Sequence, residues 1–385
     1  MEVMKIQDTK LNWTLNAVAR VLVGLVFLFS SFVKGVDPMG TAFKVTEYMT
    51  AWSIGGLTFE WAVPLAPFLS MALITAEFVV GVMLITGSFR RLTAWLLAAM
   101  MLFFTCTTFA DALTNKVTDC GCFGDAVKLT NWETFWKNIA LDIPTVWIVL
   151  TAGLRSKKRF ERDIIIAVFA VLAMVIFGFY NINHEPCIDF RAWKVGNKMV
   201  DMDPSLEVKS YVTYRNIETG ETEEMLSSEL MKRMEDPEWE KLWEWDTSRV
   251  EDPHEIKADG FSMLDAEMND HAMELIASEY PLMIITVHHL DKLKSEGVEA
   301  IMTMVQQAED MAIPYVLLSS ALPEQVEQFL FDNGLEGMEY YFADATAIET
   351  MLRSNPGFLL MQDGIVQGKW HYKHLPQELI IENKE

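Results

Sequence analysis

The chemistry that this sequence offers most clearly is that of thiols. It has four cysteines, and two of them are separated by a single glycine in the segment Asp119-Cys120-Gly121-Cys122-Phe123-Gly124-Asp125. Two thiols at this spacing can close only a small, strained ring, and strain makes a disulfide easier to exchange. The motif therefore predicts redox work at Cys120 and Cys122.

The other two cysteines, Cys106 and Cys187, are candidates for a resolving or relay thiol. A structural alternative stays open, in which Cys120 or Cys122 bonds Cys187 and ties its loop to the following segment. Four cysteines allow three pairings, so the sequence does not choose among them. A metal site is less favoured, because no histidine is nearby in sequence and the ligands would be thiolates alone.

The elements that must position these thiols are predicted to be membrane helices. Crossing roughly 30 Å of hydrocarbon takes about 20 mostly apolar helical residues. Five segments fit this requirement, at approximately 15–33, 64–86, 92–113, 135–154 and 164–180.

Basic residues predict the orientation of these spans, because Lys and Arg concentrate on the cytoplasmic side. Lys5 and Lys10, Arg90-Arg91 and the segment 155–162 fall on one side when five spans alternate. The N-terminus is then cytoplasmic, and everything after Tyr180 lies outside. No cysteine is placed in the cytoplasm, which suits a disulfide system.

Two carboxyl groups fall inside predicted spans, Glu77 in the second and Asp142 in the fourth. A carboxylate in hydrocarbon is costly unless it is protonated, paired or hydrated, so each is a functional candidate. One hypothesis is a proton or quinone-linked site formed by Glu77, Asp142 and Asn138. The other is a hydrogen bond that fixes packing, with Asn138 or Thr75 as the neighbour.

These motifs resemble the DoxX-like superfamily and, within it, the MauE branch. The resemblance rests on Cys-Gly-Cys-Phe-Gly at 120–124, on Trp132 and Lys137-Asn138, on Phe32-Val33-Lys34-Gly35 and on Ala76-Glu77-Phe78. It covers about residues 12–154 and implies a four-helix membrane bundle linked to disulfide maturation of exported proteins or to quinone-linked sulfur chemistry. Lys137 stands where the family leads us to expect arginine.

From about residue 191 the pattern changes to short β-rich runs alternating with amphipathic helices, which predicts an α/β domain with a mixed sheet. Strands are expected at 208–214, 282–287, 315–319, 358–362 and 365–370, and helices at 298–311, 324–331 and 346–353. Asp363-Gly364 suits a tight hairpin between the last two strands. This order of elements is that of the thioredoxin fold.

The segment Asn355-Pro356-Gly357-Phe358-Leu359-Leu360 resembles TlpA-like thioredoxins, in which a proline, usually cis, precedes a strand and faces the redox pair. The resemblance covers about residues 190–376. No Cys-x-x-Cys follows Val287, however, and His288-His289-Leu290-Asp291 stand near its place. Without thiols the domain cannot exchange disulfides itself. The two histidines are expected to be solvated, with metal binding or pH sensing as the alternative.

Charge divides the chain unevenly, because residues 1–180 carry a net charge of +2 and residues 181–385 carry −25. Such acidity excludes nucleic acid as a favoured partner. An acidic insertion at about 218–279 bears several tryptophans. It is expected to be a solvated helical face with buried tryptophans, or else a surface that docks a basic partner.

The sequence thus predicts an α-helical membrane bundle, a four-helix DoxX-like core plus a fifth transmembrane helix, followed by a thioredoxin-like domain that lacks CxxC. The expected divisions are 1–155, 156–185 and 186–385. The hypothesis is thiol–disulfide or quinone-linked maturation of exported proteins, with a periplasmic client or a thioredoxin-like partner. The alternative is a non-catalytic membrane scaffold with structural disulfides.

Overall fold

The computed structural model describes residues 9–54, 57–117, 121–153, 159–200, 209–234, 236–251, 256–258 and 260–380. Cys120 and the basic segment 155–158 lie outside these residues. The chain divides into two compact units, Met1–Arg191 and Ala192–Glu385.

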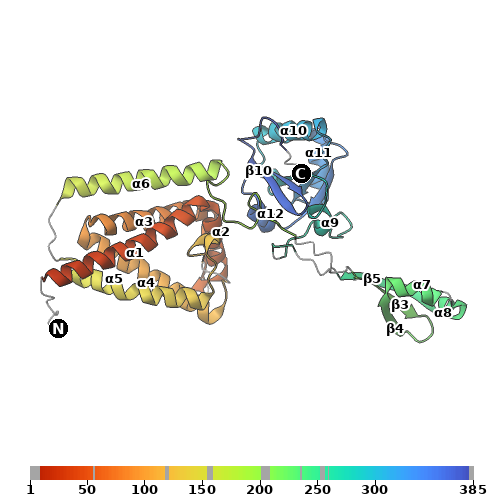
Figure 1. Ribbon diagram of the computed structural model, residues 1–385, viewed down its shortest axis with the longest axis horizontal. Helices are drawn as coiled ribbons and strands as arrows, with labels where there is room; N and C mark the ends of the chain where they lie inside the picture. Colours follow the sequence, from red (N-terminus) through yellow and green to blue (C-terminus); the bar gives the residue numbers. More distant parts are fainter. Residues whose placement is uncertain are drawn as a thin grey trace. The chain divides into compact units, whose positions relative to one another are not determined.

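The first unit is a bundle of long helices (Figure 1). Its helices are α1 Lys10–Val36, α2 Pro38–Ala51, α3 Ala66–Thr86, α4 Arg90–Thr114, α5 Asn131–Thr151 and α6 Phe160–Asn183. Four segments of the described chain are long and apolar enough to cross a membrane: Lys10–Val36, Glu60–Thr86, Arg90–Thr114 and Phe160–Asn183. Large apolar side chains on their surfaces, such as Phe68, Trp95 and Phe103, are 60–72% exposed. These helices imply a lipid bilayer around the unit.

The predicted crossing at 135–154 is not confirmed. The corresponding helix α5 has 21 residues, but Glu133, Lys137 and Asp142 lower its hydropathy, and it is not among the four apolar segments. It packs against α4 and α1 and so belongs to the bundle. Its first turn is fixed by a capping box, in which the Thr130 hydroxyl accepts the backbone N–H of Glu133 and the Glu133 carboxylate accepts from Thr130.

The long linker between the first two spans contains an ordered helix. α2 begins at Pro38, and the Asp37 carboxylate accepts the Gly40 N–H at 2.9 Å. A short strand pair, β1 Ser53–Ile54 with β2 Leu57–Thr58, and a 3-10 turn at Glu60–Leu65 lead into α3.

Two glycines let α1 and α3 approach closely. A Cβ atom on Gly24 would lie 3.1 Å from the Gly81 carbonyl oxygen and 2.8 Å from Ile85 Cγ1. A larger residue at Gly24 or Gly81 would therefore force the two helices apart. This contact lies in the same interface that brings Lys34 of α1 to Glu77 of α3.

The second unit contains a five-stranded mixed sheet of order β10-β9-β6-β7-β8. The strands are β6 Leu282–Val287, β7 Tyr315–Ser319, β8 Glu339–Phe342, β9 Gly357–Gln362 and β10 Ile365–His371. β6, β7 and β8 are parallel, whereas β9 runs antiparallel to both β6 and β10.

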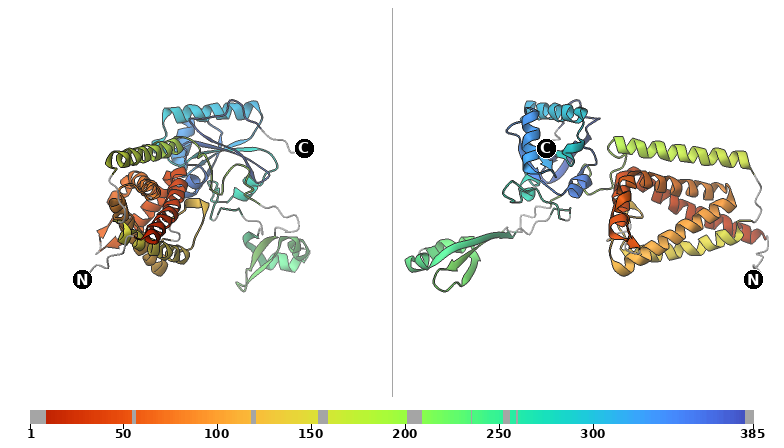
Figure 2. Two further views of the ribbon diagram at one scale, coloured as in Figure 1. Left: turned by 60° about the vertical axis from the view of Figure 1, so that its left-hand side comes forward. Right: turned by 180° about the vertical axis from the view of Figure 1, so that it is seen from behind.

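Helices cover both faces of this sheet (Figure 2). Met283, Ile285 and Val287 of β6 point to the face packed by α10 Ser295–Asp310 and α11 Pro323–Asp332. Leu282 and Ile284 point to the other face, which α9 Ala272–Ile276 and α12 Ala345–Met351 cover. Burial on both faces explains why the β6 sequence is a continuous apolar run.

The predicted sheet-containing domain is confirmed in its main elements. The strands expected at 282–287, 315–319, 358–362 and 365–370 are β6, β7, β9 and β10, and the three expected helices are α10, α11 and α12. Asp363 and Gly364 form the predicted hairpin turn with φ of 52° and 71°. The strand β8 was not predicted.

The acidic insertion differs from its prediction. The strand expected at 208–214 is β3 Lys209–Asn216, and it joins the insertion in a second sheet of order β4-β3-β5, with β4 Thr222–Leu226 and β5 Trp243–Glu251. Two short helices, α7 Ser227–Met234 and α8 Pro237–Leu242, lie between β4 and β5 in the chain. The expected helical face is therefore wrong for 243–251. Trp239 is buried as expected, and its ring stacks on Trp243 with centroids 5.8 Å apart.

Candidate functional site

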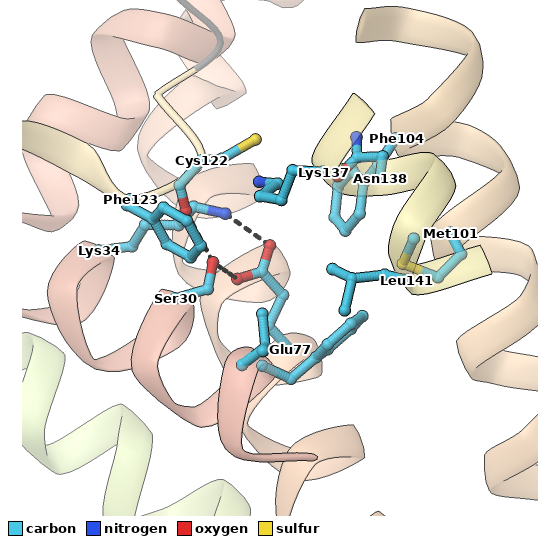
Figure 3. Close-up of a pocket in the computed structure, with 12 residues that line it drawn as sticks. Ser30, Lys34, Glu77, Met101, Phe104, Cys122, Phe123, Lys137, Asn138 and Leu141 are labelled. Carbon is cyan, nitrogen blue, oxygen red and sulfur yellow. Dashed lines mark hydrogen bonds and ion pairs between the residues drawn. The ribbon is translucent and has the colours of Figure 1, made fainter. Parts of the chain in front are cut away.

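A small cavity in the membrane unit collects most of the polar groups that the sequence singled out. It is lined by Ser30, Lys34, Glu77, Cys122, Lys137 and Asn138 together with apolar side chains of α1, α4 and α5 (Figure 3). Its volume is about 40 Å³, which is room for only a few waters. Cys122 and Glu77, far apart in sequence, are thus brought to one site.

The centre of the site is a buried ion pair. Lys34 Nζ lies 2.6 Å from Glu77 Oε1, and the two side chains are 8% and 2% exposed. Helical side chains lean toward the N-terminus of their own helix. Because α1 and α3 are antiparallel neighbours joined through α2, the Lys34 and Glu77 side chains lean toward each other.

Ser30 connects this pair to the cysteine loop. Its hydroxyl lies 2.7 Å from the Cys122 carbonyl oxygen and 3.1 Å from Glu77 Oε2. A serine hydroxyl has one hydrogen to donate. The hydroxyl therefore shares its hydrogen between the Cys122 carbonyl oxygen and the Glu77 carboxylate, with the shorter contact to Cys122. Ser30 thus fastens the backbone of the cysteine loop beside the Lys34–Glu77 pair.

The residue after Cys122 is also fixed. The Phe123 ring packs against Phe29 with centroids 5.4 Å apart, and the Lys137 ammonium lies 4.4 Å from the centre of the Phe123 ring. A cation over an aromatic face is attracted by the ring quadrupole. Phe123 therefore fastens the loop to α1 and α5 at once.

Of the polar residues predicted within the spans, Glu77 and Asn138 line this cavity and Asp142 does not. The Asn138 amide donates to Thr108 Oγ1 at 3.1 Å, and Thr105 donates to Asp142 Oδ2 at 2.9 Å. Asn138 and Asp142 thus each make a hydrogen bond between α5 and α4. The Thr75 hydroxyl, the other neighbour considered, makes no hydrogen bond in the described part of the chain.

Of the two remaining cysteines, Cys187 is held at the end of α1. The Cys187 N–H donates to Asn181 Oδ1 at 3.2 Å, and Asn181 in turn donates to the Gly35 carbonyl oxygen at 3.1 Å. Cys187 is therefore tied to the end of α1 that holds the Cys122 loop, and it is exposed.

Cys106 lies away from the site. On α4 it is two residues past Phe104, which lines the cavity, and two residues turn a helix by about 200°. Cys106 is exposed on the bundle surface, and among the described residues no disulfide joins Cys106, Cys122 and Cys187 to one another. Because Cys120 is outside the described residues, the pairing of Cys120 with Cys122 stays a prediction.

Sequence reasoning missed Ser30 and Lys34 as site residues. Lys34 does not stand out as a site residue, because a lysine near the end of an apolar run is typical of an interface anchor. Its partner lies 43 residues away in sequence, and no local pattern links the two. The signal that could have found the pair was a lysine near the end of one apolar helix and a single glutamate within the next long apolar helix.

The second unit has a histidine pair where the sequence lacks the thioredoxin cysteines. His288 is 8% exposed, so the expectation that it is solvated is wrong. Its Nε2 lies 3.8 Å from Glu349 Oε1, and His289 Nε2 lies 3.6 Å from the same oxygen. Burial, followed by repulsion from His289, Lys292 and Arg353, lowers the pKa of His288 to about 4. Burial raises the pKa of Glu349.

This pair is attached to the segment with the expected proline. The Asn355 side chain donates to the His289 carbonyl oxygen at 2.8 Å and accepts the His289 N–H at 3.3 Å. The Asn355–Pro356 bond is cis. A groove of about 540 Å³ opens beside the histidines, with Gln325, Gln328 and Asp332 of α11 along it.

The fold and the site define a membrane helical bundle that holds a cysteine loop over a buried ion pair. Residues 12–151 match the family described as Methylamine utilisation protein MauE. The membrane region is therefore MauE-like, as the motifs between residues 12 and 154 indicated.

The chain is also similar to Protein TlpB from Flavobacterium psychrophilum, at 24% identity over 177 residues. This match covers 45% of the chain and 44% of that protein, so the chain spans less than half of the length of this relative. No solved structure matches the chain.

Proposed function

We propose that this protein carries out thiol–disulfide exchange in the maturation of exported proteins, with Cys120 and Cys122 as the exchangeable pair. The observation that carries the proposal is that Cys122 lines one small cavity with the buried Lys34–Glu77 pair. Charged groups in a membrane bundle are expensive and mark functional positions. The similarity to MauE and to TlpB agrees with a membrane protein of this kind.

The exchange itself needs a thiolate and a way to handle protons. A Cys122 or Cys120 thiolate attacks a partner disulfide, one sulfur–sulfur bond forms as another breaks, and the departing thiolate takes up a proton. The second cysteine then attacks the mixed disulfide and closes the ring. Ser30, which donates to both the Cys122 carbonyl oxygen and Glu77, would hold the loop beside the ion pair during these steps.

A quinone does not fit this cavity. The residues expected to bind one were Glu77, Asp142 and Asn138, but Asp142 does not line the cavity and the Asn138 amide donates to Thr108. A volume of about 40 Å³ is also too small for a quinone ring, since it holds only a few waters. We therefore propose that a partner thiol donates the electrons, or that a partner disulfide accepts them.

Cys187 is the better candidate for the third thiol of this exchange. It is exposed and held at the end of α1 near the Cys122 loop, whereas Cys106 is on the outer surface of α4. In this proposal Cys187 resolves or relays the disulfide, and Cys106 takes no part.

The proposed location is a bacterial inner membrane, with the N-terminus cytoplasmic and the second unit in the periplasm. The basic residues support this orientation. The Phe89 N–H donates to Asp163 at 3.0 Å, which places Arg90-Arg91 and Arg162 at one end of the bundle. That end is then the cytoplasmic one.

The second unit is proposed to be a thioredoxin-like domain without its own thiols that docks an extracytoplasmic client. The groove along α11, beside His288 and His289, is the proposed contact. Reversing charge in this groove by Asp332→Arg should lower client capture and leave the alkylation of Cys122 unchanged.

Trapping a mixed disulfide tests the proposed function. In native membranes, Cys120→Ser and Cys122→Ser variants should each leave one unresolved thiol, and at least one should accumulate a covalent partner that a reductant releases. Cys106→Ser is the matched control, and it should accumulate none. If neither variant traps a partner, the scaffold alternative with fixed bonds replaces this proposal.

A further inference from the structure

Among the described residues, Lys137 is a cation without a carboxylate partner at the edge of the site. It lies on α5, half-buried, and lines the cavity with Cys122. Its ammonium lies 4.4 Å from the centre of the Phe123 ring. Salt bridges between described residues pair other cations of this unit, Lys34 and Arg162 among them, with carboxylates and leave Lys137 out.

The charge balance of the cavity, counted over its described lining, is therefore positive. Four of these lining residues can ionise: Lys34, Glu77, Cys122 and Lys137. Lys34 and Glu77 neutralise each other at 2.6 Å. A second ammonium then remains, and within the described lining Cys122 is the group left that can supply a negative charge.

The loop geometry places that thiol on the side of the second ammonium. Phe123 follows Cys122 directly, and its ring is held between Phe29 and Lys137. In Figure 3 the sulfur of Cys122 points away from the Glu77 carboxylate, on the side of the cavity where Lys137 lies. An opposite charge within about 4–6 Å favours the ionised form of a thiol, most strongly where water is scarce.

We propose that Lys137 is a positioning residue that holds Cys122 as a thiolate, so that Cys122 is the attacking cysteine of the pair. This inference rests on the proposed thiol–disulfide exchange. The Cys122 sulfur bonds to one sulfur of a partner disulfide, and the other partner sulfur leaves as a thiolate that takes a proton from solvent. Cys120 then closes the ring by displacing the partner from Cys122.

The pH dependence of alkylation tests this assignment without any turnover. Chains that keep Cys122 alone, through Cys106→Ser, Cys120→Ser and Cys187→Ser, are treated with neutral iodoacetamide in detergent from acidic to alkaline pH, with the extent read by mass. Lys137→Met should move the midpoint of the Cys122 profile upward by about one pH unit or more, because a nearby cation is lost. Lys137→Arg should restore the original midpoint. Superimposed profiles for the Lys137 chain and its Lys137→Met variant would overturn the proposal.

A second comparison does not use the Lys137→Met variant, so it remains informative if that variant fails to fold. A chain that keeps Cys187 alone is an internal reference, because Cys187 is exposed. The Cys122 midpoint should lie about one pH unit or more below that of Cys187. A Cys122 midpoint equal to or above the Cys187 midpoint refutes a Lys137-stabilised thiolate.

Failure of this inference is distinguishable from failure of the proposed function. Mixed-disulfide trapping with unshifted alkylation profiles would remove the role of Lys137 and keep the exchange. Shifted profiles without any trapped partner would keep the role of Lys137 and remove the exchange.

Discussion

The Lys34–Glu77 pair predicts a pattern of stability changes that few other arrangements would produce. At 2.6 Å, the attraction between unit charges is about 6 kcal/mol for an effective dielectric constant of about 20. Desolvating the two ions costs several kcal/mol each, so the intact pair contributes little in total. Removing one partner is different, because it leaves a single buried charge.

The cost of a single substitution is limited by the cost of neutralising the charge that remains. At pH 7 a carboxylate with a reference pKa of about 4.3 takes up a proton for about 4 kcal/mol, and an ammonium with one of about 10.4 loses a proton for about 5 kcal/mol. We therefore expect Lys34→Met and Glu77→Gln each to lower the free energy of unfolding by about 3–5 kcal/mol. The double variant should cost well under the sum of the two.

The double-mutant cycle separates a buried ion pair from two independent side chains. Because each single variant leaves one charge without its partner, the coupling between the two substitutions should be of order 3 kcal/mol. The assay is unfolding in mixed detergent micelles followed by circular dichroism. Penalties that simply add in the double variant would refute the buried pair.

Three further predictions concern packing and the second unit. Gly24→Val should destabilise the bundle by about 1–3 kcal/mol, measured in the same assay, because its side chain would collide with the backbone of Gly81. His288→Gln should remove an acid sensitivity. The pKa of His288 in the folded chain is about 4, below the reference of about 6.5, so protonation at low pH favours the unfolded state and stability is lost between about pH 6.5 and 4. Hydrogen exchange of β6 amides should show a loss of up to about 3 kcal/mol over that window in the native chain, and a smaller loss in the variant. Trp239→Ala should loosen the β4-β3-β5 sheet by about 3–5 kcal/mol, since Trp239 is buried and stacked on Trp243, and protease cleavage within 209–251 should increase while the β6 amides stay protected.

Much of the second unit could be predicted because its elements have clear local signals. The run Leu282–Val287 is apolar throughout, which is typical of a strand covered on both faces. Asp363-Gly364 carries the residues that a tight hairpin requires.

The secondary structure of the acidic insertion was harder to predict, because its residues have no consistent preference for helix or strand. Trp243–Glu251 mixes charged, polar and aromatic side chains and pairs with Lys209–Asn216, a partner distant in sequence. Strand formation there depends on that pairing, which no local pattern reveals.

Only part of the candidate site could be predicted from the sequence. Cys122 and Glu77 stood out by residue type, but the cavity that joins them depends on side chains from α1, α3 and α5 that meet only in the folded bundle. Lys34 and Ser30 are residue types that are common near the end of a helix. The close approach of α1 and α3 depends on Gly24 and Gly81. Long-range complementarity of this kind is set by packing and not by periodicity.

The redox state of the cysteine loop in intact membranes tests the central claim most directly. Membranes are equilibrated at a series of thiol-to-disulfide ratios, quenched with acid and labelled with a mass-tagged maleimide, in chains that retain only Cys120 and Cys122. The account predicts that the pair passes reversibly between two labelled and no labelled thiols as the ratio changes. A pair that stays fully oxidised, or fully reduced, at every ratio would contradict it.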